Sequence, residues 1–452
     1  MIDASVLFLT FTDQQRLVGF SGKKWINLKC TADIDDNWYD PMCRVFTNVL
    51  RYDTFRGANI GGICQANREI IEIAEIYHPK YVIYPCTFIG IITEATLTAL
   101  RKIGCVVVGY FFDEDSYFEA VSRWMIPYID YFVSGLDIPG GIVAAYESLG
   151  ARCILGTPLP TNPAIFCKLK GVEKLYNATF VGRTYSNRLE YFANISNHGG
   201  DIKYLGGGYE QKIHFSKIVK IYNQSRINLN FTKGPASTSD RHITGRVFEV
   251  TLSGGFLLTE YAAGLENYFE IGREIECFET AQEAAEKIQY YLKHSDEREQ
   301  IAECGYLRAQ REYTGQVQLS RVFREIEDDL FKRGRPVLPT PVNEINLLRQ
   351  MDARGYFKWA CALRKSPPPL RDEWYATAEL VLFTNPRHKT AKRLLRRAKK
   401  WGSPEPMVIR LCMVVYQVLI FLYKAVKSET PSIVKRMIKK VFRYNRATED
   451  LF

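Results

Sequence analysis

Residues 246–269 read RVFEVTLSGGFLLTEYAAGLENYF, and this stretch decides the fold of the second half of the chain. Arg246 and Glu249 stand at the start of a short apolar run that predicts a helix. Gly254 and Gly255 predict the end of that helix, because glycine accepts the backbone geometry of a helix C-terminus and lets the chain pack closely onto the next strand. The FLLTE that follows predicts a buried strand. A helix that opens with a charged pair between two strands is a candidate ligand-binding element.

Short apolar runs alternate with helical patterns on both sides of a proline-rich segment, TPLPTNPAIF, at 157–166. Runs that predict strands include 5–11, 44–53, 81–87, 105–112 and 227–232. Alternation of this kind predicts parallel, doubly wound sheets with right-handed crossovers. We therefore predict an α/β protein with two Rossmann-like domains, at 1–160 and 161–334. They face each other across a cleft at the carboxyl ends of their strands, where open α/β sheets bind ligands.

The remaining residues, 335–452, predict a basic α-helical extension. The chain has 60 Lys and Arg against 50 Asp and Glu, and residues 351–452 hold 22 of the basic and 8 of the acidic groups. The first 350 residues are therefore mildly acidic, and the extension carries the positive charge that attracts an anionic partner. A nucleic-acid partner is not predicted, because no base-reading module accompanies the charge.

The extension has the pattern of a helix that lies on a membrane surface. In SIVKRMIKKVFRYNR, apolar residues fall on one helical face and basic residues on the other, as in helices at the surface of an anionic bilayer. The apolar run 411–423 is too short to span a bilayer, which takes about 20 residues. A buried helix with a solvated basic face is the alternative. The predicted membrane-contacting residues are Trp401, Lys435, Arg436, Lys439 and Lys440.

Eleven cysteines are scattered without paired metal-ligand spacing, which predicts reduced thiols in a cytoplasmic protein and no structural zinc. The N-terminal run predicts a first strand and not a signal peptide. The expected location is therefore the cytoplasm, with peripheral attachment to the inner face of the cell membrane.

Two loops of the second domain have the residues of a nucleotide diphosphate pocket. The first, VGRTYSNR, holds Gly182, Arg183 and Arg188 before a predicted helix, whose N-terminus attracts phosphate. The second is the 233–246 loop, which leads into the helix with Arg246. One turn further in, a carboxylate suits a pair of ribose hydroxyls better than phosphate. The candidate donor-binding residues are Gly182, Arg188, Asn230, His242, Arg246, Glu249, Gly254 and Gly255.

The same residues resemble the C-terminal half of group 1 glycosyltransferases of GT-B fold, and within them a spore-maturation-protein-like subgroup. The motifs that match are the R-x-F-E, the Gly-Gly, the LLT and the G-x-E at 272–274. The resemblance covers about residues 175–330 well and residues 80–156 more loosely. It does not cover residues 335–452. The resemblance implies transfer of a sugar from a nucleotide-diphosphate donor, mostly with retention. It implies that Glu249 binds the ribose and that Arg183 and Arg188 contact the diphosphate. The family's first glutamate is replaced here by Arg241.

Two residues are candidates for the chemistry. Arg183 can stabilise charge on the leaving diphosphate without a metal. Asp113, in FFDEDSYF at the end of a predicted strand, can orient or deprotonate an acceptor hydroxyl. The alternatives for the acidic motif are a D-x-D metal site and capping of the next helix. We predict no metal and no cofactor beyond the nucleotide-sugar substrate.

The predicted function is a glycosyltransferase that acts on a glycan or a lipid-linked saccharide at a membrane surface. Three alternatives stay open. Arg246 and Glu249 can be a helix-surface ion pair without function. The protein can be a nucleotide-sugar epimerase of the same fold, or a scaffold that binds the nucleotide sugar without catalysis.

Overall fold

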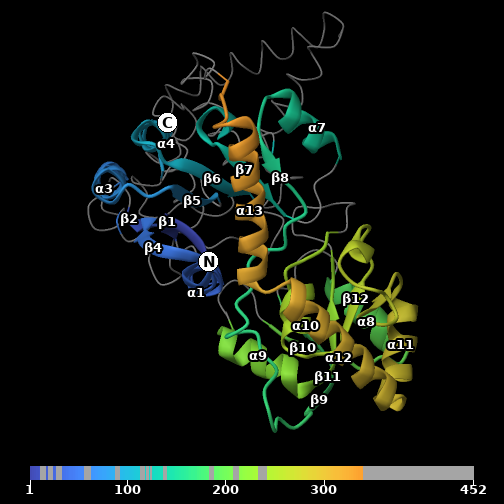
Figure 1. Cartoon of the computed structure of the whole chain (residues 1–452). Helices are drawn as coiled ribbons and strands as arrows, with labels where there is room; N and C mark the ends of the chain where they lie inside the picture. The colour runs from blue at the N-terminus through green and yellow to red at the C-terminus, as the bar shows by residue number, and fades with distance from the viewer. Residues whose placement is uncertain are drawn as a thin grey trace, which may run out of the picture. The chain divides into compact units, whose positions relative to one another are not determined.

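The computed structural model describes residues 1–10, 17–18, 24–26, 33–54, 57, 63–86, 92–111, 118, 122, 125–135, 140–182, 188–206, 213–232 and 242–339. Two parallel sheets organise this part of the chain (Figure 1). Strand neighbours within both sheets run parallel, which confirms the predicted α/β class with two Rossmann-like sheets.

The first sheet has the strand order β4-β1-β5-β6-β7-β8. Its strands are β1 (Ile2–Thr10), β4 (Phe46–Asp53), β5 (Tyr81–Cys86), β6 (Val106–Phe111), β7 (Tyr131–Ser134) and β8 (Cys153–Ile154). The helices of this half are α1 (Asp33–Val45), α3 (Ile63–Tyr77), α4 (Glu94–Ile103), the 3-10 turn η2 (Ile126–Tyr128) and α7 (Gly140–Ser148). A separate antiparallel pair joins β2 (Leu17–Val18) to β3 (Lys24–Ile26).

The structure differs from the predicted pattern at the start of β4. The sequence predicts a strand over 44–53, but Arg44 and Val45 form the last turn of α1, a helix that the pattern does not predict. An internal Pro41 lowers the local helix propensity of this segment. Packing overrides that preference, because Trp38 and Met42 are buried against the first sheet.

The second sheet has the strand order β10-β9-β11-β12-β13. Its strands are β9 (Tyr176–Val181), β10 (Lys203–Leu205), β11 (Ser225–Asn230), β12 (Leu257–Glu260) and β13 (Glu276–Phe278). The helices are α8 (Arg188–Asn197), α9 (Phe215–Gln224), α10 (Arg246–Leu252), the 3-10 turn η3 (Leu265–Asn267), α11 (Ala281–Lys293), α12 (Ser295–Glu312) and α13 (Gly315–Arg333). Two hydrophobic clusters, one with α8 and α11 and the other with α9 and α10, pack with its strands, so this sheet is doubly wound as predicted.

The helix α13 packs in the core of the first sheet, although the predicted boundary assigns it to the second domain (Figure 1). The ring of Phe323 lies 4.8 Å from that of Phe46 and 4.9 Å from that of Tyr81. Lys80 and Tyr81 both donate hydrogen bonds to the carboxylate of Glu327. The last helix of the described chain therefore stabilises the N-terminal sheet. The boundaries at 160 and 334 stay predictions.

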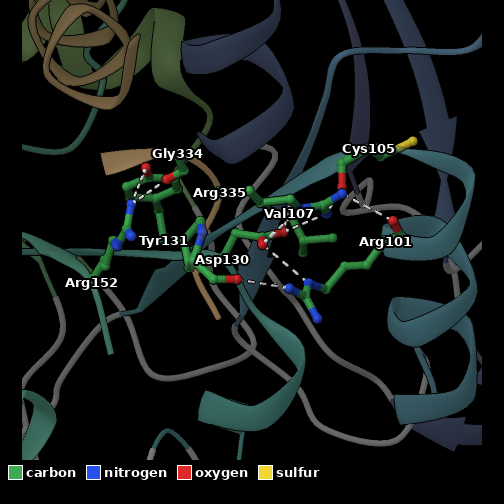
Figure 2. Close-up of polar contacts among 9 residues, drawn as sticks. Arg101, Cys105, Val107, Asp130, Tyr131, Arg152, Gly334 and Arg335 are labelled. Atoms are coloured by element: carbon green, nitrogen blue, oxygen red, sulfur yellow. Dashed lines mark hydrogen bonds and ion pairs between the residues drawn. The ribbon is translucent and has the colours of Figure 1, made fainter. Parts of the chain in front are cut away.

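The chain after α13 is fastened to the first sheet by a buried aspartate (Figure 2). Asp130 is fully buried and receives hydrogen bonds from Nε of Arg101 at 3.1 Å and from the backbone N–H of Val107 at 2.8 Å. Arg335 donates to both carboxylate oxygens, at 3.1 and 3.0 Å, and also to the carbonyl of Cys105. A buried carboxylate with two cationic partners holds the residues that follow α13 in one place.

None of the helices in the described residues is both long and apolar enough to cross a bilayer. The predicted membrane-contacting residues lie outside the described part of the chain: Trp401, Lys435, Arg436, Lys439 and Lys440.

Candidate functional site

Most of the predicted donor-binding residues lie at the carboxyl edge of the second sheet, whereas Gly254 and Gly255 do not. The parallel strands β9, β11 and β12 end there, at Val181, Asn230 and Glu260. Gly182 follows the first of these strands, and α10 begins at Arg246. This edge is where open parallel sheets bind their ligands.

The guanidinium of Arg246 is held in a fixed position at this edge. Its Nη1 donates a hydrogen bond of 2.7 Å to Oδ1 of Asn230, and the group lies 5.0 Å from the centre of the Phe180 ring. A Cβ at Gly182 would lie 2.9 Å from Nη2 of Arg246 and 2.8 Å from Cζ of Phe180, so only glycine leaves room for this arrangement. The buried Nε of Arg246 has no partner among the described residues. The cation is therefore preorganised, and among the described residues no carboxylate forms an ion pair with it.

Asn230 holds its neighbours in position through hydrogen bonds of its side-chain amide. Its Oδ1 accepts a second hydrogen bond, from Oγ1 of Thr244 at 3.0 Å, and its Nδ2 donates to Oγ1 of Thr259 at 2.9 Å. The residue is fully buried. Because both ends of the amide are engaged by the protein, the structure gives Asn230 the task of positioning Arg246.

Glu249 is held by a different residue. The buried Tyr222 on α9 donates a hydrogen bond of 3.0 Å to Oε2 of Glu249. Burial raises the pKa of Glu249, although Arg246 and the hydrogen bond from Tyr222 both act to lower it. A partly buried carboxylate of this kind accepts hydrogen bonds strongly from hydroxyl groups.

Arg246 and Glu249 do not form an ion pair with each other in the described part of the chain. Arg246 donates a hydrogen bond to Asn230 on β11, and Glu249 accepts one from Tyr222 on α9. Both side chains are partly buried. The alternative of a helix-surface ion pair is therefore not the arrangement in the structure.

Arg188 lies on the same aromatic ring as Arg246. Its guanidinium is 5.2 Å from the centre of the Phe180 ring, and its Nη2 donates to the backbone carbonyl of Phe231 at 3.3 Å. Only 4% of Arg188 is exposed. Phe180 thus brings two predicted donor-binding cations together, and contact of Arg188 with a diphosphate stays a prediction.

A carboxylate that the sequence interpretation missed ends β12. Oε2 of the buried Glu260 accepts hydrogen bonds from the backbone N–H of Thr232 at 3.0 Å and from its Oγ1 at 2.9 Å. The backbone N–H of His242 donates to the carbonyl of Thr232 at 3.0 Å. Glu260 therefore anchors the segment on which His242 lies. The sequence signal that could have identified Glu260 is an acidic residue at the end of the predicted apolar strand FLLTE.

Gly254 and Gly255 lie at the opposite edge, before the first residue of β12. The N–H of Gly255 bonds to the carbonyl of Val250 and that of Gly254 to the carbonyl of Thr251, which is a Schellman ending of α10. Gly254 has a φ of +68°, as that ending requires. A Cβ at Gly255 would lie 2.6 Å from Nδ2 of Asn228. The predicted packing role of both glycines is confirmed, while contact with the donor stays a prediction.

The two predicted catalytic residues, Asp113 and Arg183, lie outside the described residues, as does Arg241. Within the described ranges, no group of three His, Cys, Asp or Glu side chains is placed to hold a metal ion.

Comparison with known proteins matches one segment of the chain. Residues 174–323 match a family described as glycosyl transferase-like. This stretch contains α10 and the whole second sheet. The expectation of a glycosyltransferase is confirmed at this level, whereas the spore-maturation-protein-like subgroup stays a prediction. No curated protein matches the chain.

Several solved structures are similar to this chain. The structure of Anabaena HepE in complex with UDP-glucose has a TM-score of 0.48 and 10% identity, over 72% of this chain and 100% of that one. Sucrose-phosphate synthase from Thermosynechococcus elongatus has a TM-score of 0.45 and 9% identity, over 72% and 100%. A glycosyltransferase from Rickettsia africae has a TM-score of 0.45 and 10% identity, over 74% and 100%.

Proposed function

We propose that this protein transfers a sugar from a nucleotide-diphosphate donor to a glycan or a lipid-linked saccharide at a membrane surface, with retention and without a metal. The donor binds at the carboxyl edge of the second sheet. The observation that carries the proposal is that Arg246 donates to the buried Asn230 and Glu249 accepts from the buried Tyr222, so that among the described residues the two side chains are positioned by hydrogen bonds and not by an ion pair with each other. One site thus offers a cation for the leaving diphosphate and a carboxylate for the hydroxyls of the nucleoside.

The chemistry follows from the position of these charges. Cleavage of the bond between the sugar and the diphosphate develops negative charge on the leaving oxygen. A guanidinium already fixed by Asn230 and Phe180 stabilises that charge without reorganising during the reaction. The carboxylate of Glu249 accepts a hydrogen bond from a ribose hydroxyl and so orients the nucleoside. In this proposal Asp113 and Arg183 keep their predicted catalytic roles, and the basic residues of the C-terminal extension bring the site to an anionic membrane.

The test is donor turnover by the full chain. Purified protein is incubated with UDP-, GDP-, CDP- and dTDP-sugars, with and without EDTA, and the released nucleotide is measured. We expect release from one class of donor, insensitivity to EDTA, and loss of turnover in Glu249→Ala. Identification of the sugar product separates transfer from epimerisation. Absence of release and of any donor-induced thermal shift would overturn the donor site, and binding without turnover would favour the scaffold.

A further inference from the structure

Tyr222 is placed to orient Glu249, although it lies on a helix that carries none of the predicted site residues. It comes from the second half of α9, and only 2% of it is exposed. Its hydroxyl donates to Oε2 of Glu249 at 3.0 Å, and its backbone carbonyl accepts a hydrogen bond of 3.2 Å from Nδ2 of Asn228. The phenol is therefore fixed by its burial and by the hydrogen bond of its hydroxyl, while the bond from Asn228 holds the backbone of Tyr222.

The two oxygens of Glu249 have different surroundings. Oε2 is engaged by Tyr222, whereas Oε1 lies 4.0 Å from the position of a Cβ on Gly245, at the start of α10. Among the described residues, Oε1 has no hydrogen-bond partner. Gly245 presents no side chain to fill that space. One oxygen is therefore engaged by Tyr222, and the other, which lies near Gly245, has no partner in the part of the chain that the structure describes.

We propose that Tyr222 is a positioning residue for nucleotide binding: by occupying Oε2 of Glu249 it directs Oε1 toward a hydroxyl of the donor's ribose. This inference rests on the proposed function, because it requires that Glu249 contacts a nucleoside. It adds a residue from α9 to a site otherwise built from the ends of β9 and β11 and from α8 and α10.

The hydrogen bond also affects the protonation state of Glu249. In the described structure, the charged and titratable groups that act on this carboxyl are Tyr222 on α9 and Arg246 on α10. Burial raises the pKa of Glu249, and these two groups counteract burial. Removal of the Tyr222 hydroxyl therefore raises that pKa further. When the solution is acidified, Glu249 of the variant is therefore protonated at a higher pH than in wild type. The carboxylate that accepts the hydroxyl hydrogen bond is lost at that pH.

The experiment compares two tyrosine-to-phenylalanine variants of the full chain. Tyr222→Phe removes the bond to Glu249 and keeps the ring. Tyr291→Phe is the matched control, because Tyr291 also donates from a buried ring to a glutamate, Glu276, at 2.8 Å, but at the amino end of β13. Titration calorimetry measures binding of UDP, GDP, CDP and dTDP, and of the 2′,3′-dideoxy form of whichever nucleotide binds, across a series of pH values.

We expect Tyr222→Phe to weaken binding of the preferred nucleotide by about tenfold, the scale of one hydrogen bond to a charged group. The acid limb of the binding curve should move to higher pH, and the loss should disappear with the dideoxy nucleotide. Tyr291→Phe should change none of these. Because the phenyl ring preserves the packing, a melting curve is sufficient to verify the fold of both variants.

Two results separate the possible failures. If Tyr222→Phe binds like wild type while Glu249→Gln loses binding, the positioning role is wrong and the proposed donor site stands. If wild type binds none of the four nucleotides, the proposed function is wrong, and the role of Tyr222 that depends on it is wrong as well. A double variant, Tyr222→Phe with Glu249→Gln, gives a third check. Its loss should equal that of Glu249→Gln alone, and additive losses would contradict action through Glu249.

Discussion

Nη1 of Arg246 lies 2.7 Å from Oδ1 of Asn230, so the first residue of α10 is bound to the last residue of β11. This bond joins the helix to a strand that ends sixteen positions earlier in the sequence. It fixes a cation at the edge of a parallel sheet, where its charge is available to an anionic ligand.

Arg246→Ala should lower kcat/KM for the donor by about 10² to 10³-fold, the effect of removing one preorganised donor to developing negative charge. Arg226→Ala is the matched control, because Arg226 is an arginine near the amino end of β11 whose Nη1 donates to Asn177. Steady-state kinetics with the preferred donor measure both. Equal losses in the two variants would mean that Arg246 has no special role.

Asn230→Asp should lower kcat/KM by about tenfold, because it replaces the neutral amide that binds Arg246 with a carboxylate that neutralises the charge of Arg246. The change nearly preserves side-chain volume but removes the hydrogen bond that Nδ2 donates to Thr259, so the melting temperature should also fall and is measured beside the kinetics. Kinetics at several salt concentrations provide the measurement. Activity equal to wild type would show that the charge of Arg246 is not used.

Gly182→Ala should reduce donor binding, since the new methyl would lie 2.9 Å from Nη2 of Arg246 and 2.8 Å from the Phe180 ring. We expect a displaced guanidinium and a weaker affinity in titration calorimetry. Gly255→Ala gives the contrast. Its methyl would meet Nδ2 of Asn228 at 2.6 Å, on the far edge of the sheet, and should cost about 1 to 3 kcal/mol of stability. Full affinity in Gly182→Ala would contradict the crowding argument.

The strands and most helices could be predicted from the sequence because buried parallel strands are uninterrupted apolar runs. α1 could not, because its Pro41 argues against a helix and only contact of Trp38 with the sheet favours one. For the candidate site, the sequence pattern contains only part of the arrangement. Arg246 and Glu249 share a short motif, whereas the role of Tyr222 depends on how α9 packs against α10. No local pattern contains that contact.

Asp130→Asn should destabilise the protein by about 3 kcal/mol, because it leaves two arginines without their buried partner. The arginine side chains are 22% and 32% exposed, which allows water to relieve part of the cost. Urea unfolding measures the change. Asp201→Asn, on an exposed residue, is the control and should stay within about 0.5 kcal/mol of wild type.

Asp329 should make stability depend on acid pH. Burial alone would raise the pKa of this carboxyl, but hydrogen bonds from Tyr131, Arg333 and Arg152 outweigh burial and hold the pKa below its ordinary value of 3.8. A carboxyl with a lowered folded pKa stabilises the fold above the unfolded value, and this contribution is lost as the pH falls through the folded value.

The comparison is wild type against Asp329→Asn, with Asp328→Asn as an exposed control on the same helix. The difference in the free energy of unfolding between wild type and Asp329→Asn should be constant at neutral pH. It should shrink once the pH falls below 3.8. A difference that is the same in acid and at neutral pH would rule out an ionised Asp329 as its source.

Deletion of 405–452 should release the protein from anionic vesicles if the extension is the membrane attachment that its sequence predicts. Replacement of Lys435, Arg436, Lys439 and Lys440 by glutamine should have a similar effect. Each basic residue contributes about 1 kcal/mol near an anionic surface, so the four together account for about a thousandfold in affinity.

Co-sedimentation with phosphatidylcholine vesicles, with and without phosphatidylglycerol, measures this membrane binding. Electrostatic attachment requires that wild type binds only when the anionic lipid is present and that salt weakens the binding. Unchanged binding of the truncated chain would place the membrane contact elsewhere, and the acceptor could then no longer be inferred from the charge of the extension.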